Sequence, residues 1–158
     1  MNTVMQSLAR NMTRFTAIAA IALFCGFQSG DNTCDQKALK DKAKKLLEPY
    51  KYDLAKVTRI VFKDKPTMKE IEVPLFIGEK YKLVFNLEAL PRNVVINCYN
   101  RDKDNTKRKL MFSSKDGGDK REFAFEYSFA NKIFVDYDIP AGDSTATGGC
   151  LVFMLGYK

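Results

Sequence analysis

Hydrophobic and polar residues alternate with a period of two along most of the chain after residue 56. In residues 71–77 and 81–87 nearly every second side chain is apolar, which is typical of β-strands that bury one face. The same pattern predicts six further strands, at residues 57–62, 93–100, 108–113, 121–129, 132–138 and 150–157. The tight Gly78–Glu79 corner predicts that 71–77 and 81–87 pair as a hairpin.

The connections between these segments are short and rich in turn-forming residues, and no second helix-length pattern interrupts them. Without crossover helices the strands must pair mainly antiparallel. We therefore expect an all-β fold, an antiparallel β-sandwich or jelly roll of about eight strands, with a closed barrel as the alternative. Pro74 lies within a strand, which predicts an edge strand or a bulge there.

Before residue 56 the apolar residues recur at steps of three and four, which predicts one amphipathic N-terminal helix. The residues of its apolar stripe are Leu39, Ala43, Leu46 and Leu47. Capping oxygens are expected from Asp31, Asn32 and Thr33. Pro49 ends the helix, because proline lacks the donor that a continuing helix needs. We expect the helix to pack on the sheet; a position on a membrane surface is the alternative.

The first thirty residues have the layout of a secretory signal peptide. Arg10 and Arg14 precede an apolar run at residues 15–24, and no acidic residue occurs before Asp31. This run is shorter than the ~20 residues that a membrane-spanning helix needs. We therefore interpret residues 1–30 as a signal peptide.

A signal peptide indicates a secreted or periplasmic protein. Once residues 1–30 are removed, we expect two parts: a helix and its connection (31–55) and a β-sandwich domain (56–158). Cys25, at the end of the apolar run, resembles the acylated cysteine of bacterial lipoproteins. Phe24 departs from that pattern, which has a small residue at this position. A protein anchored to the membrane through Cys25 is the alternative to a soluble exported protein.

The chain is basic, with 26 Lys and Arg against 19 Asp and Glu and a net charge of +7. Without Arg10 and Arg14 the exported part carries about +5. Much of the positive charge lies in residues 37–45 and 101–109, where it is interleaved with Asp or Asn. We expect no nucleic-acid partner for an exported protein. A protein, an anionic glycan or an envelope surface is the expected partner.

Three cysteines remain after the signal peptide, which permits one disulfide in an oxidising compartment. Cys98 follows the period of Val94 and Ile96, which predicts a buried and inert thiol. Cys34 precedes the helix and Cys150 begins the last strand, so both lie at element ends where the backbone can adjust. We favour a structural Cys34–Cys150 bond, and the two other pairings stay open.

The chain contains no histidine, which excludes Ser-His-Asp and Cys-His catalysis and any zinc site built on imidazole. It also lacks the glycine-rich phosphate-binding motifs, and we expect no cofactor. Carboxylate pairs remain, because Asp136 and Asp138 share one face of a strand, as do Glu122 and Glu126. A solvated sheet face is the main interpretation, and a small secreted hydrolase with paired carboxylates is the alternative.

Two clusters of oxygen ligands are candidates for calcium. The first consists of Asp136, Asp138 and Asp143. The second consists of Asp102, Asp104 and Asn105, where the neighbouring cations would repel a metal ion.

Three aromatic residues fall opposite the apolar sets of their strands: Phe76, Tyr99 and Phe134. They are candidates for a ligand-binding patch if they share an exposed face. We prefer the interpretation that the helix covers them, because its apolar stripe must find some sheet surface.

The order of strands and turns in residues 70–157 resembles the bacterial pre-peptidase C-terminal type of β-sandwich domain. The segments that carry the resemblance are 78–83, 93–100, 123–125, 133–137 and the last strand, entered through Gly148–Gly149. The family's aspartate-rich strand is replaced here by residues 93–97. The resemblance implies a non-catalytic accessory domain like those of secreted enzymes, some of which bind calcium or matrix polymers. We therefore expect an exported protein that acts by binding a polymer, a surface or a protein partner, without catalysis.

Overall fold

The computed structural model describes residues 34–90, 94–128, 130–142 and 148–158. Helix α2 (Gln36–Leu47) comes first in this part of the chain, and a short 3-10 helix, η1 (Ser114–Gly117), follows the fifth strand. The strands are β1 (Lys51–Ile60), β2 (Thr67–Pro74), β3 (Lys80–Asn86), β4 (Val95–Tyr99), β5 (Leu110–Ser113), β6 (Glu122–Ser128), β7 (Lys132–Ile139) and β8 (Gly149–Tyr157). The predicted signal peptide with Cys25 lies outside the described residues, as do Asp31, Asn32, Thr33 and Asp143.

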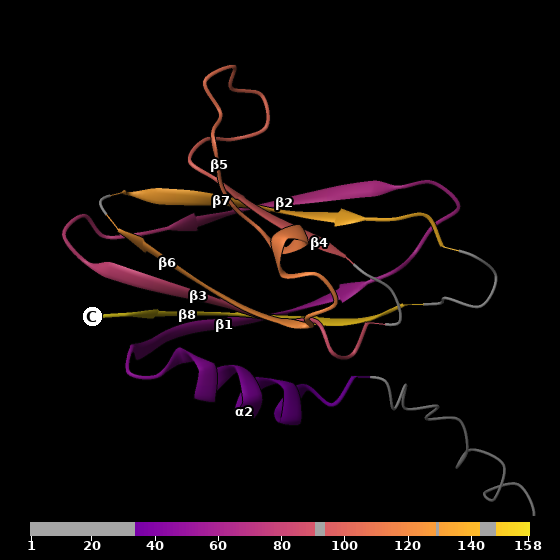
Figure 1. Cartoon of the computed structure of the whole chain (residues 1–158), viewed down its shortest axis with the longest axis horizontal. Helices are drawn as coiled ribbons and strands as arrows, with labels where there is room; N and C mark the ends of the chain where they lie inside the picture. Colours follow the sequence, from indigo (N-terminus) through magenta and orange to yellow (C-terminus); the bar gives the residue numbers. More distant parts are fainter. Residues whose placement is uncertain (1–33, 91–93, 129, 143–147) are drawn as a thin grey trace, which may run out of the picture. The chain divides into compact units, whose positions relative to one another are not determined.

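The eight strands form two four-stranded antiparallel sheets and not a closed barrel (Figure 1). The strand order is β1-β8-β3-β6 in the first sheet and β2-β7-β4-β5 in the second. All eight predicted strands are therefore confirmed, although β1 begins at Lys51, inside the segment expected to be a connection. Pro74 is the last residue of β2, which is an edge strand, as its sequence predicted.

The predicted hairpin of residues 71–77 and 81–87 is wrong. These segments form β2 and β3, which belong to different sheets: β2 pairs with β7, and β3 pairs with β6 and β8. Both strands nevertheless turn their alternating apolar residues toward one core, where Val73 and Leu83 are 3% and 0% exposed. Alternation marks the buried face of a strand equally well whether its neighbour lies beside it or across the core.

The main hydrophobic core lies between the two sheets. Its fully buried members include Phe85 and Phe153 from the first sheet, and Ile96, Val135 and Tyr137 from the second. The rings of Phe85 and Phe153 stack at 5.3 Å between centroids. Cys98 is a free thiol within this core, and its burial raises its pKa, so that the predicted inert thiol is confirmed.

Helix α2 covers the other face of the β1-β8-β3-β6 sheet (Figure 1). Leu39, Ala43 and Leu47 pack against a group of outward-facing strand residues. The members of this group are Val84, Cys150, Val152 and Met154. Because both faces of β8 are covered, residues 149–156 are buried without interruption. Strand β8 is thus the central element on which the core and the helix layer meet.

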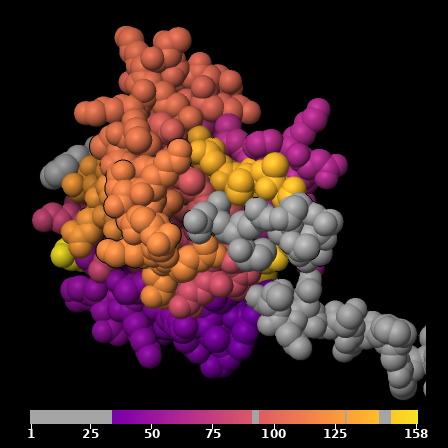
Figure 2. Space-filling view, turned by 45° about the vertical axis from the view of Figure 1, so that its right-hand side comes forward, coloured from indigo at the N-terminus to yellow at the C-terminus, as the bar shows by residue number. Residues whose placement is uncertain are grey.

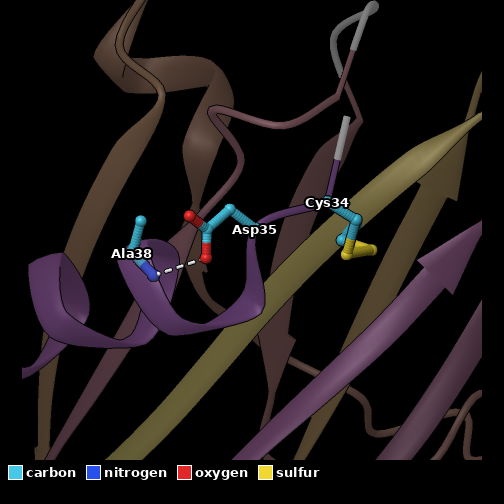
Figure 3. The surroundings of a disulfide bond; sticks show 4 residues. Cys34, Asp35 and Ala38 are labelled. Carbon is cyan, nitrogen blue, oxygen red and sulfur yellow. Dashed lines mark hydrogen bonds between the residues drawn. A yellow bond between two sulfur atoms is a disulfide. The ribbon is translucent and has the colours of Figure 1, made fainter. Parts of the chain in front are cut away.

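The start of α2 is fixed by a cap and a disulfide (Figure 3). The carboxylate of Asp35 accepts a hydrogen bond of 3.0 Å from the backbone N–H of Ala38, so the N-cap is Asp35 and not an earlier residue. Cys34 is bonded to Cys150, with 5.5 Å between their Cα atoms. The pairing favoured from the sequence is the one that the structure contains. The bond closes a span of 116 residues and contributes up to ~4.7 kcal/mol in the chain-entropy account.

Candidate functional site

The uncovered face of the β2-β7-β4-β5 sheet carries a row of polar side chains. On β7, Val135 and Tyr137 point into the core, so the alternation turns Asp136 and Asp138 to the opposite face. The strand register then places Glu70 of β2 and Asn97 of β4 on either side of Asp136. Two carboxylates that are far apart in the sequence are thereby direct cross-strand neighbours.

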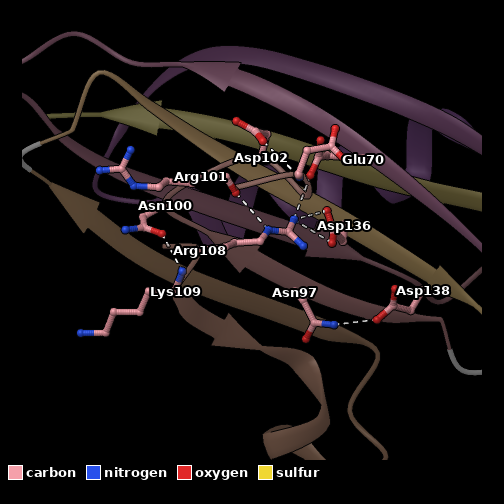
Figure 4. A network of polar contacts seen from close by, with 10 residues as sticks. Glu70, Asn97, Asn100, Arg101, Asp102, Arg108, Lys109, Asp136 and Asp138 are labelled. Atoms are coloured by element: carbon pink, nitrogen blue, oxygen red, sulfur yellow. Dashed lines mark hydrogen bonds and ion pairs between the residues drawn. The ribbon is translucent and has the colours of Figure 1, made fainter. Parts of the chain in front are cut away.

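Arg108 joins these two carboxylates (Figure 4). It belongs to residues 100–109, which connect β4 to β5 and which we call the β4–β5 loop. Its Nη2 donates hydrogen bonds of 2.8 Å to Oε2 of Glu70 and to both carboxylate oxygens of Asp136. The Asp136 residue is only 3% exposed, so its charge depends on this partner.

Two further contacts hold the Arg108 side chain in place. The Nε group donates a hydrogen bond of 3.0 Å to the backbone carbonyl of Arg101, across the loop (Figure 4). The guanidinium also lies over the ring of Tyr99, 3.5 Å from its centroid, which is a cation–π arrangement. Arg108 therefore fastens the two ends of the loop to each other and to the sheet.

The charges at this centre are not fully balanced. Burial raises the pKa of Glu70 above its ordinary value of 4.5, and repulsion from Asp136 raises it further, while Arg108 opposes the shift. A single guanidinium thus forms ion pairs with two carboxylates that repel each other.

The β4–β5 loop is shaped by its own Asp and Asn side chains. The Oδ1 atom of Asp102 accepts from the backbone N–H of Asp104, and Oδ1 of Asn105 accepts from that of Lys107. These are side-chain turns of the kind that Asp and Asn commonly form. The second candidate calcium cluster thus has Asp102 and Asn105 engaged in turn formation.

The loop presents cations to solvent. It stands out from the β2-β7-β4-β5 sheet as the projecting segment in Figures 1 and 2. Four of its basic residues are exposed: Arg101, Lys103, Lys107 and Lys109. Only Asp104 among its acidic residues is equally exposed, since Asp102 is half-buried. The loop is therefore a projecting basic surface that Arg108 holds against the sheet.

Asp136 and Asp138 of the first candidate calcium cluster accept hydrogen bonds from protein side chains. Both oxygens of Asp136 accept from Arg108, whose charge occupies the position that a cation would need. An oxygen of Asp138 accepts a hydrogen bond of 2.7 Å from the side-chain amide of Asn97. Asp143 lies outside the described residues, so a site that includes it stays a prediction. Within the described ranges, no group of three or more Asp, Glu, Cys or His side chains is placed to hold a metal ion.

The carboxylates considered for a hydrolase do not converge. Glu122 and Glu126 lie on β6, in the other sheet from Asp136 and Asp138. Glu122 accepts a hydrogen bond of 2.9 Å from the side chain of Asn86, and Glu126 is exposed. The expected solvated face also needs correction at Asp136, which is buried because Arg108 folds over it.

The three candidate aromatics do not form one patch. Tyr99 and Phe134 are cross-strand neighbours on the second sheet, and their rings lie under the cationic groups of Arg108 and Lys132. Phe76 lies apart from them, in the connection between β2 and β3, and is 78% exposed. The expectation that the helix covers these residues is wrong, because α2 packs on the other sheet.

Sequence reasoning missed the role of Arg108. The signal available to it was the composition of residues 101–109, where turn-forming Asp and Asn alternate with cations. Nothing in that pattern distinguishes the anchoring arginine from its exposed neighbours, because the partners of Arg108 are 38 and 28 residues away.

Comparisons with family models, with curated proteins and with solved structures found no match to this chain. In the described part of the chain, no helix has the length and apolar character needed to cross a membrane.

Proposed function

We propose that this chain is an exported, non-catalytic binding protein, and that its β4–β5 loop engages an anionic polymer or surface. The observation that carries the proposal is the group of four exposed cations on a loop fastened to the sheet by Arg108. An anchored loop loses less conformational entropy on binding than a free one, which favours binding. The clustered charge also steers anionic partners toward the loop.

The proposed scaffold is a β-sandwich with jelly-roll connectivity. The orders β1-β8-β3-β6 and β2-β7-β4-β5 support it, because each sheet takes strands alternately from the two halves of the chain. The similarity to pre-peptidase C-terminal type domains would fit an accessory binding role. It remains a prediction.

Export is supported by the disulfide between Cys34 and Cys150, since such bonds persist in oxidising compartments. We propose a secreted or periplasmic location, with residues 1–30 as the signal peptide. Anchoring through an acylated Cys25 is the alternative to release as a soluble protein. A carboxylate hydrolase has less support, because Asp136 is committed to Arg108 and Glu126 lies on the other sheet.

Sedimentation with lipid vesicles and retention on dextran sulfate test the proposed function. The purified protein is compared with a variant that carries Lys103→Gln and Lys107→Gln. The matched control carries Lys44→Gln and Lys45→Gln, which removes the same charge from exposed positions of α2. We expect the loop variant to weaken binding to dextran sulfate or to phosphatidylglycerol vesicles by about tenfold at low salt.

The control should weaken binding less than twofold, and uncharged dextran and phosphatidylcholine vesicles should not bind. Equal losses in the two variants would assign binding to net charge and contradict the role of the loop. An absence of binding to both anionic probes would contradict the proposed function.

A further inference from the structure

We propose a second binding site, for an alkylammonium group, in an open pocket between β1 and the β2–β3 connection. This pocket has a volume of about 320 Å³. Its described lining consists of Asp53, Phe76, Glu79, Tyr81 and Tyr157. Three aromatic rings and two carboxylates are the combination that recognises an organic cation. This site goes beyond the proposed function, because its ligand has the opposite charge.

Asp53 enters the lining through an irregularity of the backbone. Strand β1 pairs with β8 at Tyr52 and again at Leu54, and the register shifts between them, so that Asp53 has no partner. Such a bulge redirects a side chain at the cost of a regular ladder. The extra residue of this edge strand is the one that brings a carboxylate to the pocket.

The aromatic part of the pocket is held in place by the fold. Tyr81 is 2% exposed, and its hydroxyl accepts a hydrogen bond of 3.0 Å from the backbone N–H of Phe76. Tyr157 packs against the main core. The turn that follows Phe76 depends on Gly78, whose φ of +103° is unfavourable for other residues. The two tyrosine rings and the backbone of Phe76 are thereby in place before any ligand arrives, which lowers the entropy cost of binding.

The charge of the lining is one-sided. It holds two carboxylates and, among the described residues, no Lys or Arg. Two neighbouring cations lie on the helix side of the sheet instead, because the Nζ groups of Lys82 and Lys158 lie over the ring of Tyr50, which packs with the helix. The Nζ of Lys82 also donates to the backbone carbonyl of Glu48. Glu79 and Tyr81 both line the pocket, and alternation along β3 turns Lys82 to the face opposite Tyr81.

A neutral ligand would use the rings but not the two carboxylates, and an anion would be repelled by them. An alkylammonium group uses both, because its charge can lie between the carboxylates while its carbon chain contacts the aromatic rings. The group has two natural sources, a free amine and the lysine side chain of another protein.

Titrations followed by backbone amide NMR shifts test the site. The probes are n-propylammonium chloride, Nα-acetyl-lysine amide and neutral n-propanol. Both ammonium probes should shift the signals of Asp53, of residues 76–81 and of Tyr157, while propanol should leave them in place. Stronger binding of the lysine derivative would identify a protein lysine as the source, and equal binding a free amine; both results support the site.

Variants Glu79→Gln and Asp53→Asn should each weaken ammonium binding about fivefold, the size expected of one partly solvated charge contact. The matched control is Glu126→Gln, an exposed carboxylate on the helix side of β6, and it should change binding less than twofold. The protein spectrum shows in the same experiment whether each variant is folded. Shifts of equal size with propanol, equal weakening by Glu126→Gln, or no shifts up to about 50 mM ammonium would overturn the proposal. None of these results depends on the anionic probes used for the β4–β5 loop.

Discussion

Replacement of Arg108 by Ala is the most direct test of the polar centre under the β4–β5 loop. The change removes the three hydrogen bonds to Glu70 and Asp136, the bond to the Arg101 carbonyl and the contact with the Tyr99 ring. It leaves Asp136 beneath the loop without its cation. We expect a marked loss of stability, because an unpaired buried carboxylate is costly.

The magnitude follows from the exposure of the partners. Removing one member of a fully buried ion pair costs about 3–5 kcal/mol. Here the side chains of Arg108 and Glu70 are 17% and 18% exposed, and that of Asp136 is 5% exposed. Solvent screens the Glu70 contact more than the Asp136 contact, so we expect a loss of about 2–4 kcal/mol.

Urea unfolding followed by circular dichroism measures this loss, with the midpoint temperature as a second readout that should fall by about 10 °C. Arg101→Ala is the matched control, since it removes an exposed arginine from the same loop and should cost less than about 0.5 kcal/mol. Arg108→Ala combined with Asp136→Ala should recover part of the loss, because no buried charge is then left unpaired. A loss for Arg108→Ala no larger than that for Arg101→Ala would refute this account of the centre.

Three further predictions concern Glu70, the disulfide and Gly149. The pKa of Glu70 is raised in the folded state, so above pH 4.5 the native protein holds more protons at Glu70 than the unfolded chain does. The free energy of unfolding therefore falls as the pH rises through this range. Glu70→Gln should remove this component, so that urea unfolding at several pH values shows wild-type stability falling relative to the variant; parallel curves would contradict it. Peptide mapping without reduction should find Cys34 linked to Cys150 and Cys98 as a free thiol, and replacing the pair by serine should cost about 2–4 kcal/mol. In Gly149→Ala the new methyl group would collide with the backbone carbonyl of Ala89, so we expect a loss of about 1–3 kcal/mol; an unchanged midpoint in urea would contradict the close approach.

The positions of the strands and cysteines could be read from the sequence because both depend on local rules. A period of two identifies the residues of a strand that face a core, and it located all eight strands. Cys98 shares that period and is buried, whereas Cys34 and Cys150 lie at element ends and pair. In each case the deciding information is the residue's place within its own segment.

The first residue of the helix and the surface on which it packs were predicted less well. The N-cap is Asp35, because the chain enters α2 directly from Cys34, whose position the bond to Cys150 constrains. The helix was expected over Phe76, Tyr99 and Phe134, but it packs on the β1-β8-β3-β6 sheet. An apolar stripe on a helix requires a partner surface without specifying which one.

The candidate binding features were decided by the tertiary structure. Whether β2 lies beside β3 or across the core from it depends on strand pairing. Strands pair through backbone hydrogen bonds, which are the same for nearly every side chain, so the sequence of one strand does not identify its partner. The pairing of β2 with β7 is what brings Glu70 next to Asp136, and the return of the β4–β5 loop over that pair makes Arg108 an anchor. The sequence by itself thus determined which segments are strands and which faces are buried, because these follow from local periodicity. Only the tertiary structure decided which charges meet, because that depends on the pairing of segments far apart in the chain.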